Sequence, residues 1–293
     1  MRLEKKRANS NLSAYIELMK PNILTLVLVS TVLGYFLGGN GIDSWIRLGL
    51  LLIGTALTAG GAGALNHYLE RDSDKLMERT KNRPLPAGII PPPNALMFGI
   101  ILVLLGTILL VYKINLLTGF LSILTSFLYI LVYTPLKKIT WLNTSIGSIP
   151  GALPPMGGWA AATGELETGA WILFAIMFLW QHPHFYAIAW ICKEDYARAD
   201  FKMLPVIEPD GKRTIRQIFW HLLLLLPVSI MPYINGSAGN VYLIGVVILT
   251  GFFFISAIPM YRTKSKNSAK LLLKSSIIYL PLLLILIIVD KAI

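Results

Sequence analysis

Residues 48–86 read LGLLLIGTALTAGGAGALNHYLERDSDKLMERTKNRPLP, and this stretch combines the two features that dominate the chain. Its first part, from Leu48 to Leu65, is uncharged and approaches the run of about 20 apolar residues that a helix needs to cross a bilayer core. Its second part is crowded with acids and bases. An apolar helix that ends in a charged loop is typical of a protein that crosses a membrane repeatedly.

The composition extends this interpretation to the whole chain. Of its 293 residues, 55% are hydrophobic and only 14% are charged, whereas a soluble domain has about a quarter charged residues. The net charge of +11 in so apolar a chain favours loops that face an anionic membrane surface over nucleic-acid binding. The single cysteine, Cys192, excludes an intrachain disulfide and is a poor basis for a metal site.

Long uncharged runs recur between clusters of charge, and from them we predict nine transmembrane helices. They are expected at residues 22–38, 48–65, 95–112, 116–133, 143–162, 170–191, 218–234, 241–260 and 271–289.

Lysines and arginines collect on one side of this pattern, and loops rich in these residues stay on the cytoplasmic side. Of the 26 lysines and arginines, only Arg47, Lys113 and Lys291 fall on the other side. This distribution predicts a cytoplasmic N-terminus. No signal peptide is expected, because polar residues separate the basic N-terminus from the first apolar run.

These observations predict an all-α fold, a polytopic integral membrane protein with nine transmembrane helices around a central cavity. Residues 1–21 would form a cytoplasmic tail, and residues 22–293 a single transmembrane domain with cytoplasmic loops at 66–94 and 192–217. The expected location is the plasma membrane of a bacterium.

The fifth predicted span is unusual, because it carries Pro150, Pro154 and Pro155 among several glycines. Proline removes a backbone hydrogen bond and kinks a helix, and unpaired backbone is costly against lipid. We therefore expect this span inside the bundle, either packed closely against its neighbours or lining a cavity.

The charged loop after the second span contains a candidate metal and phosphate site. If the second helix continues past the bilayer, Asn66, Glu70 and Asp74 lie on one face, about 6 Å apart along its axis. Such oxygen ligands suit Mg²⁺, which substrate phosphates and water usually complete. Bases that can bind phosphate follow at Arg79, Lys81 and Arg83, the last in a stiff turn with Pro84 and Pro86.

The alternative is that this loop is a solvated helix. Glu70, Asp72, Asp74 and Glu78 would then pair with bases three or four residues away and hold no ligand.

The loop after the sixth span repeats the mixture of acids and bases, so we expect one site between the two loops. Two histidines, His182 and His184, precede it among aromatic residues. An imidazole there could contact a large flat ligand or coordinate its iron, or could simply bond a neighbouring helix. Lys137 and Lys138 in the short third loop either mark the cytoplasmic face or add positive charge to a phosphate site.

These loops carry a resemblance to a known family. Asn66, Glu70 and Asp74, followed by MERTKNRPLP (77–86), resemble the first signature of the intramembrane UbiA-type aromatic prenyltransferase superfamily, in its haem-modifying branch. Further blocks resemble that branch in the same order: YTPLKK (133–138), NTSIGSIPGALPPMGGW (143–159), WQHPHF (180–185), KEDY (193–196) and MLPV (203–206).

The chain departs from the wider superfamily at two places. The first motif commonly has aspartate where this chain has Glu70, and the second is an Asp-x3-Asp pair, whereas Asp195 and Asp200 are five residues apart. Both departures are consistent with the haem-modifying branch and weaken an assignment to quinone or chlorophyll substrates.

The resemblance implies transfer of a farnesyl group from farnesyl diphosphate to a vinyl group of haem b, with addition of water, to give haem O and diphosphate. It implies Mg²⁺ as the cofactor, haem b, farnesyl diphosphate and the lipid bilayer as partners, and leaves room for membrane proteins that handle haem. The expected catalytic residues are Asn66, Glu70, Asp74, Lys193 and Asp195, with Asn66, Glu70, Asp74 and Asp195 as metal ligands. The expected substrate-binding residues are Arg79, Arg83, Lys137, Lys138, His184 and Tyr196.

Two other functions stay open at this point. A quinone-ring prenyltransferase of the same superfamily would use the same motifs. A polytopic carrier is favoured by the interrupted fifth span, since broken helices often form transport sites, but disfavoured by the scarcity of charge within the spans.

Overall fold

The computed structural model describes residues 12–292, and that part of the chain is helical without any β-strand. Residues 12–18 form a short helix, so the second half of the predicted tail is folded. Arg2, Lys5, Lys6 and Arg7 of that tail lie outside the described residues. The long helices are α2 (Pro21–Gly38), α3 (Trp45–Asp74), α4 (Pro92–Lys113), α5 (Leu116–Phe127), α7 (Asn143–Thr163), α8 (Thr168–Ile191), α11 (Lys212–Ile234), α12 (Asn240–Thr263) and α13 (Lys266–Ala292).

The predicted spans all fall on helices. Between residues 12 and 292, eight helical segments are long and apolar enough to cross a membrane, and each coincides with a predicted span. One of these segments, Leu116–Leu136, joins α5 to a π-helical turn η1 (Leu128–Tyr133) and a short α6 (Thr134–Leu136). The remaining predicted span forms α7. The all-α membrane fold is thus confirmed, while the number nine and the orientation of the N-terminus stay predictions.

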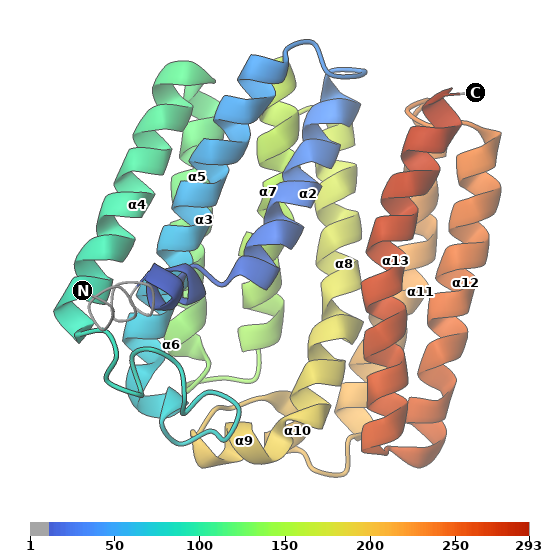
Figure 1. The fold of residues 1–293 in the computed structure, drawn as a ribbon. Coiled ribbons are helices and arrows are strands. Elements are labelled where there is room, and N and C mark those ends of the chain that lie inside the picture. The colour runs from blue at the N-terminus through green and yellow to red at the C-terminus, as the bar shows by residue number, and fades with distance from the viewer. Residues whose placement is uncertain (1–11, 293) are drawn as a thin grey trace, which may run out of the picture.

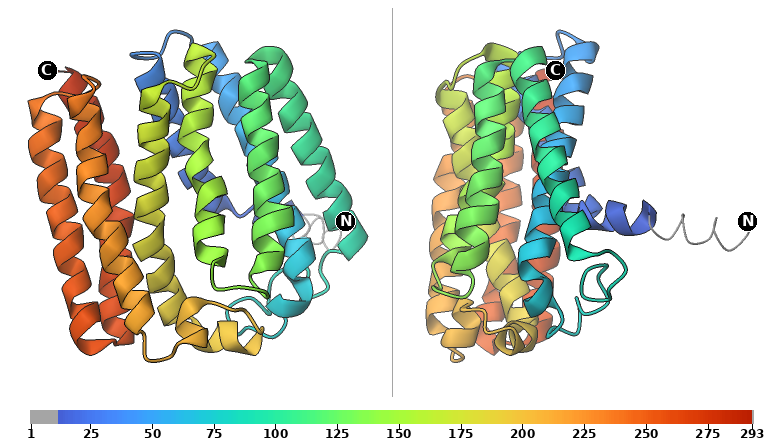
Figure 2. Two further views of the ribbon diagram at one scale, coloured as in Figure 1. Left: turned by 180° about the vertical axis from the view of Figure 1, so that it is seen from behind. Right: turned by 90° about the vertical axis from the view of Figure 1, so that its left-hand side faces the viewer.

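Helix α7 shows how a segment with three prolines remains helical. It lies between α2, α8 and α5 (Figure 2). At Gly34 of α2, an added Cβ would lie 1.8 Å from the Pro155 carbonyl oxygen, and at Gly158 it would lie 2.0 Å from the Thr31 carbonyl oxygen. The two backbones therefore touch, which keeps this part of α7 inside the bundle and away from lipid. The same helix also lines a cavity, so both expectations for this span are met.

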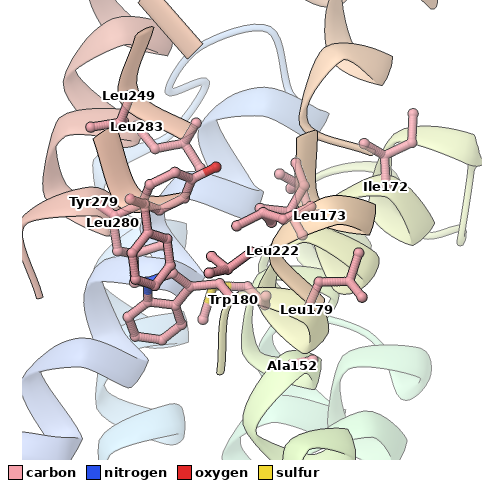
Figure 3. Packing of buried hydrophobic residues seen from close by; sticks show 14 of the residues in the cluster. Ala152, Ile172, Leu173, Leu179, Trp180, Leu222, Leu249, Tyr279, Leu280 and Leu283 are labelled. Carbon is pink, nitrogen blue, oxygen red and sulfur yellow. The ribbon is translucent and has the colours of Figure 1, made fainter. Parts of the chain in front are cut away.

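The helices form two groups. Helices between α2 and α8 provide the residues that line the cavity. Helices α11, α12 and α13 pack as a separate set against α8 (Figure 1). The largest buried apolar cluster joins the two groups; in it, Trp180 of α8 lies beside Tyr279 and Leu280 of α13 (Figure 3). The last three helices therefore pack behind α8, and none of their described residues lines this cavity.

The loops that carry the motifs lie at one end of the bundle. The loop after α3 and the short helices α9 (Lys193–Arg198) and α10 (Leu204–Ile207) share this end, while α13 finishes at the opposite end (Figure 1). This arrangement brings the two charged loops together, as predicted.

Candidate active site

Helix α3 continues without interruption to Asp74, as the spacing of its polar residues requires. Asn66 and Asp74 are fully buried and Glu70 is 7% exposed. Three oxygen-bearing side chains thus follow one stripe of the helix inside the protein. Buried carboxylates need partners of opposite charge or hydrogen-bond donors.

Those partners come from distant segments. Lys137 Nζ lies 2.6 Å from Glu70 Oε1, and Arg83 Nη1 donates to both Asp74 carboxylate oxygens, at 3.0 and 2.9 Å. For Glu70 and Asp74, the interpretation as a solvated helix with local ion pairs is therefore wrong.

Local pairing does hold for the exposed acids of the same loop. Asp72 pairs with Arg71 and Lys75, and Glu78 pairs with Lys81. The loop therefore divides into a solvated outer face and a buried inner face, and only the inner face contributes to the site.

The turn at residues 83–86 fixes Arg83. Leu85 is buried, and the Arg83 amide donates to the Thr80 carbonyl oxygen at 3.0 Å. The Thr80 hydroxyl in turn donates to the Asp74 carbonyl oxygen at 2.9 Å. The guanidinium is thereby held against Asp74, as the stiff Pro-Leu-Pro sequence suggests.

Lys20 is a member of the site that sequence reasoning missed. Its ammonium donates to Asn66 Oδ1 and, at 3.1 Å, to the Tyr129 hydroxyl. Its backbone is left-handed, with φ 55°, immediately before Pro21, where a proline disfavours the right-handed helical region for the preceding residue. Burial lowers the pKa of Lys20 to about 7, against the opposing effect of Glu70.

The π-helical turn η1 presents two tyrosines to the same region. Tyr129 and Tyr133 both line the cavity, and Lys137 Nζ lies 4.6 Å from the centre of the Tyr133 ring. Thr134 accepts a hydrogen bond from Asn66 Nδ2 at 2.8 Å and donates to the Tyr129 carbonyl oxygen at 2.8 Å. Pro135 lacks an N–H, which explains why the regular ladder widens here; such π turns are frequent at functional sites.

The loop after α8 meets the loop after α3. Asp195 Oδ1 accepts from the Glu78 amide at 2.9 Å, and the Arg79 guanidinium lies 4.8 Å from the centre of the Tyr196 ring. Partial burial acts to raise the pKa of Asp195, but hydrogen bonds from Arg198 and the Glu78 amide lower it below its usual value. Asp195 is thus an ionised link between the loops.

A cavity of about 410 Å³ lies between these groups and the helices α2 to α8. At its loop end, four cationic side chains face two carboxylates; they are Lys20, Arg79, Arg83 and Lys137 with Glu70 and Asp74. Deeper, the wall is apolar and includes Leu26, Leu110, Leu121, Leu153 and Met177. A cavity that is positively charged at one end and apolar at the other is suited to a ligand with an anionic head group and a hydrophobic tail.

The structure places the predicted residues in two groups. Those that line the cavity are Glu70, Asp74, Arg79, Arg83, Lys137, His184 and Tyr196. Asn66 is buried behind Lys20. Lys138, Lys193 and Asp195 are not among the described residues that line it, and the Lys193 ammonium lies 5.3 Å from the Trp190 ring centre instead.

The two histidines of α8 point in different directions. His184 lines the cavity, stacks on Trp180 with ring centres 5.0 Å apart, and bonds Ser276 through Nδ1 at 2.8 Å. His182 instead faces α7 and α11, where it bonds Ser145 and stacks on His221 with ring centres 3.7 Å apart. Only His184 is available to a ligand in the cavity.

The donor set of the α3 stripe fits a magnesium ion that a substrate completes. Within residues 12–292, no three His, Cys, Asp or Glu side chains converge into a self-sufficient metal site. Two carboxylates and one amide oxygen are nevertheless hard ligands, and Mg²⁺ usually takes one or two carboxylates together with phosphate oxygens and water. Glu70 and Asp74 line the cavity and suit such an ion beside a bound diphosphate, whereas Asn66 could join them only when Lys20 leaves its amide oxygen.

The chain resembles known proteins along nearly its whole length. The model of the UbiA prenyltransferase family matches residues 27–278. The chain is 44% identical to the protoheme IX farnesyltransferase of Solibacter usitatus over 286 residues, covering 94% of this chain and 98% of that protein. It is 47% identical to the protoheme IX farnesyltransferase of Salinibacter ruber over 277 residues, with the same coverage.

Solved structures share the fold. A digeranylgeranylglyceryl phosphate synthase matches with a TM-score of 0.81 at 21% identity, covering 96% of this chain and 99% of that one. A UbiA homologue from Archaeoglobus fulgidus bound to GPP and Mg²⁺ matches with a TM-score of 0.65 at 17% identity, covering 96% and 100%.

Proposed function

The chain belongs to the UbiA prenyltransferase family, and from this premise we propose that it transfers a farnesyl group from farnesyl diphosphate to a vinyl group of haem b. Water adds in the same reaction, so that the products are haem O and diphosphate. One observation carries the proposal: a single cavity combines a cationic end above two carboxylates with an apolar wall that offers an imidazole. The names of the relatives support haem b over a quinone ring, and the family argues against a carrier.

The cationic end of the cavity binds the diphosphate. Lys137 and Arg83 neutralise Glu70 and Asp74, and Arg79 adds a further positive charge. An anionic diphosphate beside Lys20 would favour the charged form of its amine. An arginine guanidinium can donate two parallel hydrogen bonds to phosphate oxygens, and a lysine ammonium places a compact positive charge beside them. These side chains turn to the diphosphate when substrate occupies the loop end.

Asn66, Glu70 and Asp74 hold Mg²⁺ against the same diphosphate. When bound, the ion supplies Lewis-acid stabilisation of the negative charge on the leaving group. The structures of a family homologue with Mg²⁺ support this use of the site. Asp195 acts at the edge of the site, where it accepts from the Glu78 amide and so joins the two loops. Positive charge and a phenol hydroxyl at the same edge come from Lys138, Lys193 and Tyr196.

The reaction requires the allylic C–O bond to break, and the farnesyl group to reach haem, before water enters the cavity. The allylic C–O bond of farnesyl diphosphate breaks, and its electron pair leaves with the diphosphate that the cations stabilise. The π electrons of a haem vinyl group then form a bond to the farnesyl C1. The new cation beside the porphyrin adds water, which loses a proton, and a hydroxyethylfarnesyl group results.

The deeper part of the cavity excludes water from the farnesyl cation. Its wall is formed by aliphatic side chains such as Leu121, Leu153 and Met177, which pack against the prenyl tail. Exclusion of bulk water prevents hydrolysis of the allylic cation before the haem vinyl group reacts. His184 contacts the haem from the α8 side of this space.

A direct test uses membranes that contain the chain, supplied with haem b, farnesyl diphosphate and Mg²⁺. Mass spectrometry of extracted haems should show haem O, accompanied by release of diphosphate, and neither product should form without farnesyl diphosphate. Prenylation of 4-hydroxybenzoate with no reaction of haem b would point to a quinone-ring enzyme. A carrier would release no diphosphate.

We further propose a multi-pass protein of the bacterial plasma membrane whose site loops face the cytoplasm, where farnesyl diphosphate is soluble. Fusing a reporter to the loop at residues 264–266 should give cytoplasmic labelling, and external labelling would reverse the orientation. Membrane proteins that deliver or collect haem are compatible partners of this arrangement.

Replacing Lys20 with methionine tests the residue that the sequence did not single out. We expect the KM for farnesyl diphosphate to rise about tenfold, because one charge-assisted contact is lost from the leaving group. The KM for haem b should stay within twofold of the wild-type value. Steady-state kinetics with each substrate varied in turn checks this, and an unchanged KM for farnesyl diphosphate would remove Lys20 from the diphosphate site.

A further inference from the structure

The helices that carry no motif contact the cavity wall from behind, through α8. Among the residues that the structure describes, those that line the cavity run from Met19 to Met203, and none of them belongs to α11, α12 or α13. Ser276 of α13 nevertheless contacts the wall from behind: its hydroxyl lies 2.8 Å from His184 Nδ1, and its carbonyl oxygen accepts from Trp180 Nε1 at 2.9 Å. One residue of the outer group thus holds two neighbouring rings of α8.

The hydrogen bonds of Ser276 fix which nitrogen of His184 carries the proton. A serine hydroxyl has one hydrogen, and here it is donated to the Leu273 carbonyl oxygen at 2.6 Å. With its hydrogen on the Leu273 carbonyl, the Ser276 oxygen accepts from His184, and this network assigns the proton to Nδ1. A charged imidazolium would leave a second N–H without an acceptor in this wall, which favours the neutral ring.

The other nitrogen is left free to meet a ligand. Within residues 12–292, His184 Nε2 has no hydrogen-bond partner, and the half-buried side chain lines the cavity. In the neutral Nδ1–H form, Nε2 carries a lone pair. Trp180, stacked at 5.0 Å with 22° between the ring planes, limits rotation of the imidazole.

The residues behind the His184 ring are buried in the protein. Ser276 is fully buried and Trp180 is 2% exposed. Trp180 packs beside Tyr279 and Leu280 in the cluster that joins α8 to the last helices (Figure 3). A change at Ser276 therefore acts on His184 without touching the diphosphate end of the cavity.

We propose that Ser276 is a positioning residue that holds His184 as the Nδ1–H tautomer and presents Nε2 as an axial ligand to the iron of the haem substrate. The inference rests on the proposed function, because it assumes that haem b enters this cavity. Histidines that bind a metal commonly donate their other ring N–H to such an outer partner, which fixes the tautomer and the ring orientation. The contact of Ser276 with His184 would give α13 a role in the placement of haem.

The test titrates haem b into the purified full-length protein in detergent and records the Soret band. Ser276→Ala should weaken haem binding by about tenfold or more and move the spectrum toward that of His184→Ala. The KM for farnesyl diphosphate should not change. Ser276→Thr keeps the hydroxyl and should recover the wild-type spectrum, and Ser275→Ala removes a neighbouring buried hydroxyl as the matched control.

The outcomes separate this inference from the function on which it rests. Wild-type haem affinity and spectrum in Ser276→Ala, together with altered values in His184→Ala, would overturn the positioning role and leave His184 as the ligand. An unchanged spectrum in His184→Ala would overturn both. Failure of the wild-type protein to make haem O would instead reject the proposed function, whatever the spectra show.

Discussion

Asp74→Asn is expected to lower farnesyl transfer by about a thousandfold while haem binding persists. Asp74 is fully buried at the end of the α3 stripe and accepts two hydrogen bonds from Arg83. Asparagine keeps the size of the side chain but removes the charge that would hold a metal ion. Turnover in purified membranes and haem binding followed by the Soret band give the two readouts.

Asp72→Asn provides the matched control for this change. Asp72 lies two residues earlier, is exposed, and pairs only with the exposed ends of Arg71 and Lys75. Surface pairs of this kind contribute little, so activity should stay within about twofold. Near-normal turnover in Asp74→Asn would remove Asp74 from the mechanism. A loss of haem binding in that variant would indicate disrupted structure instead.

The order and length of the helices could be predicted because the bilayer imposes a simple requirement. Every long uncharged run, such as residues 95–112, lies in helical structure, and α3 continues nine residues past its predicted end because its polar residues follow the helix out of the apolar core. The stripe of Asn66, Glu70 and Asp74 followed from helical periodicity alone. Only the continuation of α3 into the loop had to be assumed, and the structure confirms it.

The partners of these residues could not be predicted in the same way. Lys137 reaches Glu70 across 67 positions of the chain, and Lys20 reaches Tyr129 across 109. Such pairs depend on how helices are arranged, which periodicity does not specify. Lys20 looked like a topology signal because a base beside the first span satisfies the charge rule whether or not it enters a site.

The last helices illustrate a further limit. Their sequences contain no chemical motif, and Ser276 is an ordinary residue in an apolar run. Its significance arises only from two contacts, with rings 92 and 96 positions away. A sequence pattern therefore pointed to the proposed metal and phosphate end of the cavity more readily than to the proposed haem end.

The second large effect is expected at the contact between α2 and α7. Gly158→Ala should lower the free energy of unfolding by about 3 kcal/mol, because the new methyl group would lie 2.0 Å from the Thr31 carbonyl oxygen and 2.8 Å from the Tyr35 amide nitrogen. Both neighbours are backbone atoms, which cannot turn aside as a flexible side chain does. Denaturant unfolding of the detergent-purified protein measures the change.

Gly157→Ala is the control on the adjacent residue of the same helix. An added Cβ at Gly157 meets no atom within 4 Å, so alanine should be neutral or stabilise α7 by about 0.5–1 kcal/mol through its higher helix propensity. Equal stabilities of the two variants would contradict the close approach of α2 and α7.

The same contact links stability to catalysis. Helix α2 begins directly after Lys20, and α7 lines the cavity along much of its length. If Gly158→Ala pushes the two helices apart, Lys20 should move away from Asn66, and the KM for farnesyl diphosphate should rise as it does in Lys20→Met. A destabilised variant with an unchanged KM would show that α2 gives way elsewhere and that the turn at Lys20 is held by Asn66 and Tyr129 alone.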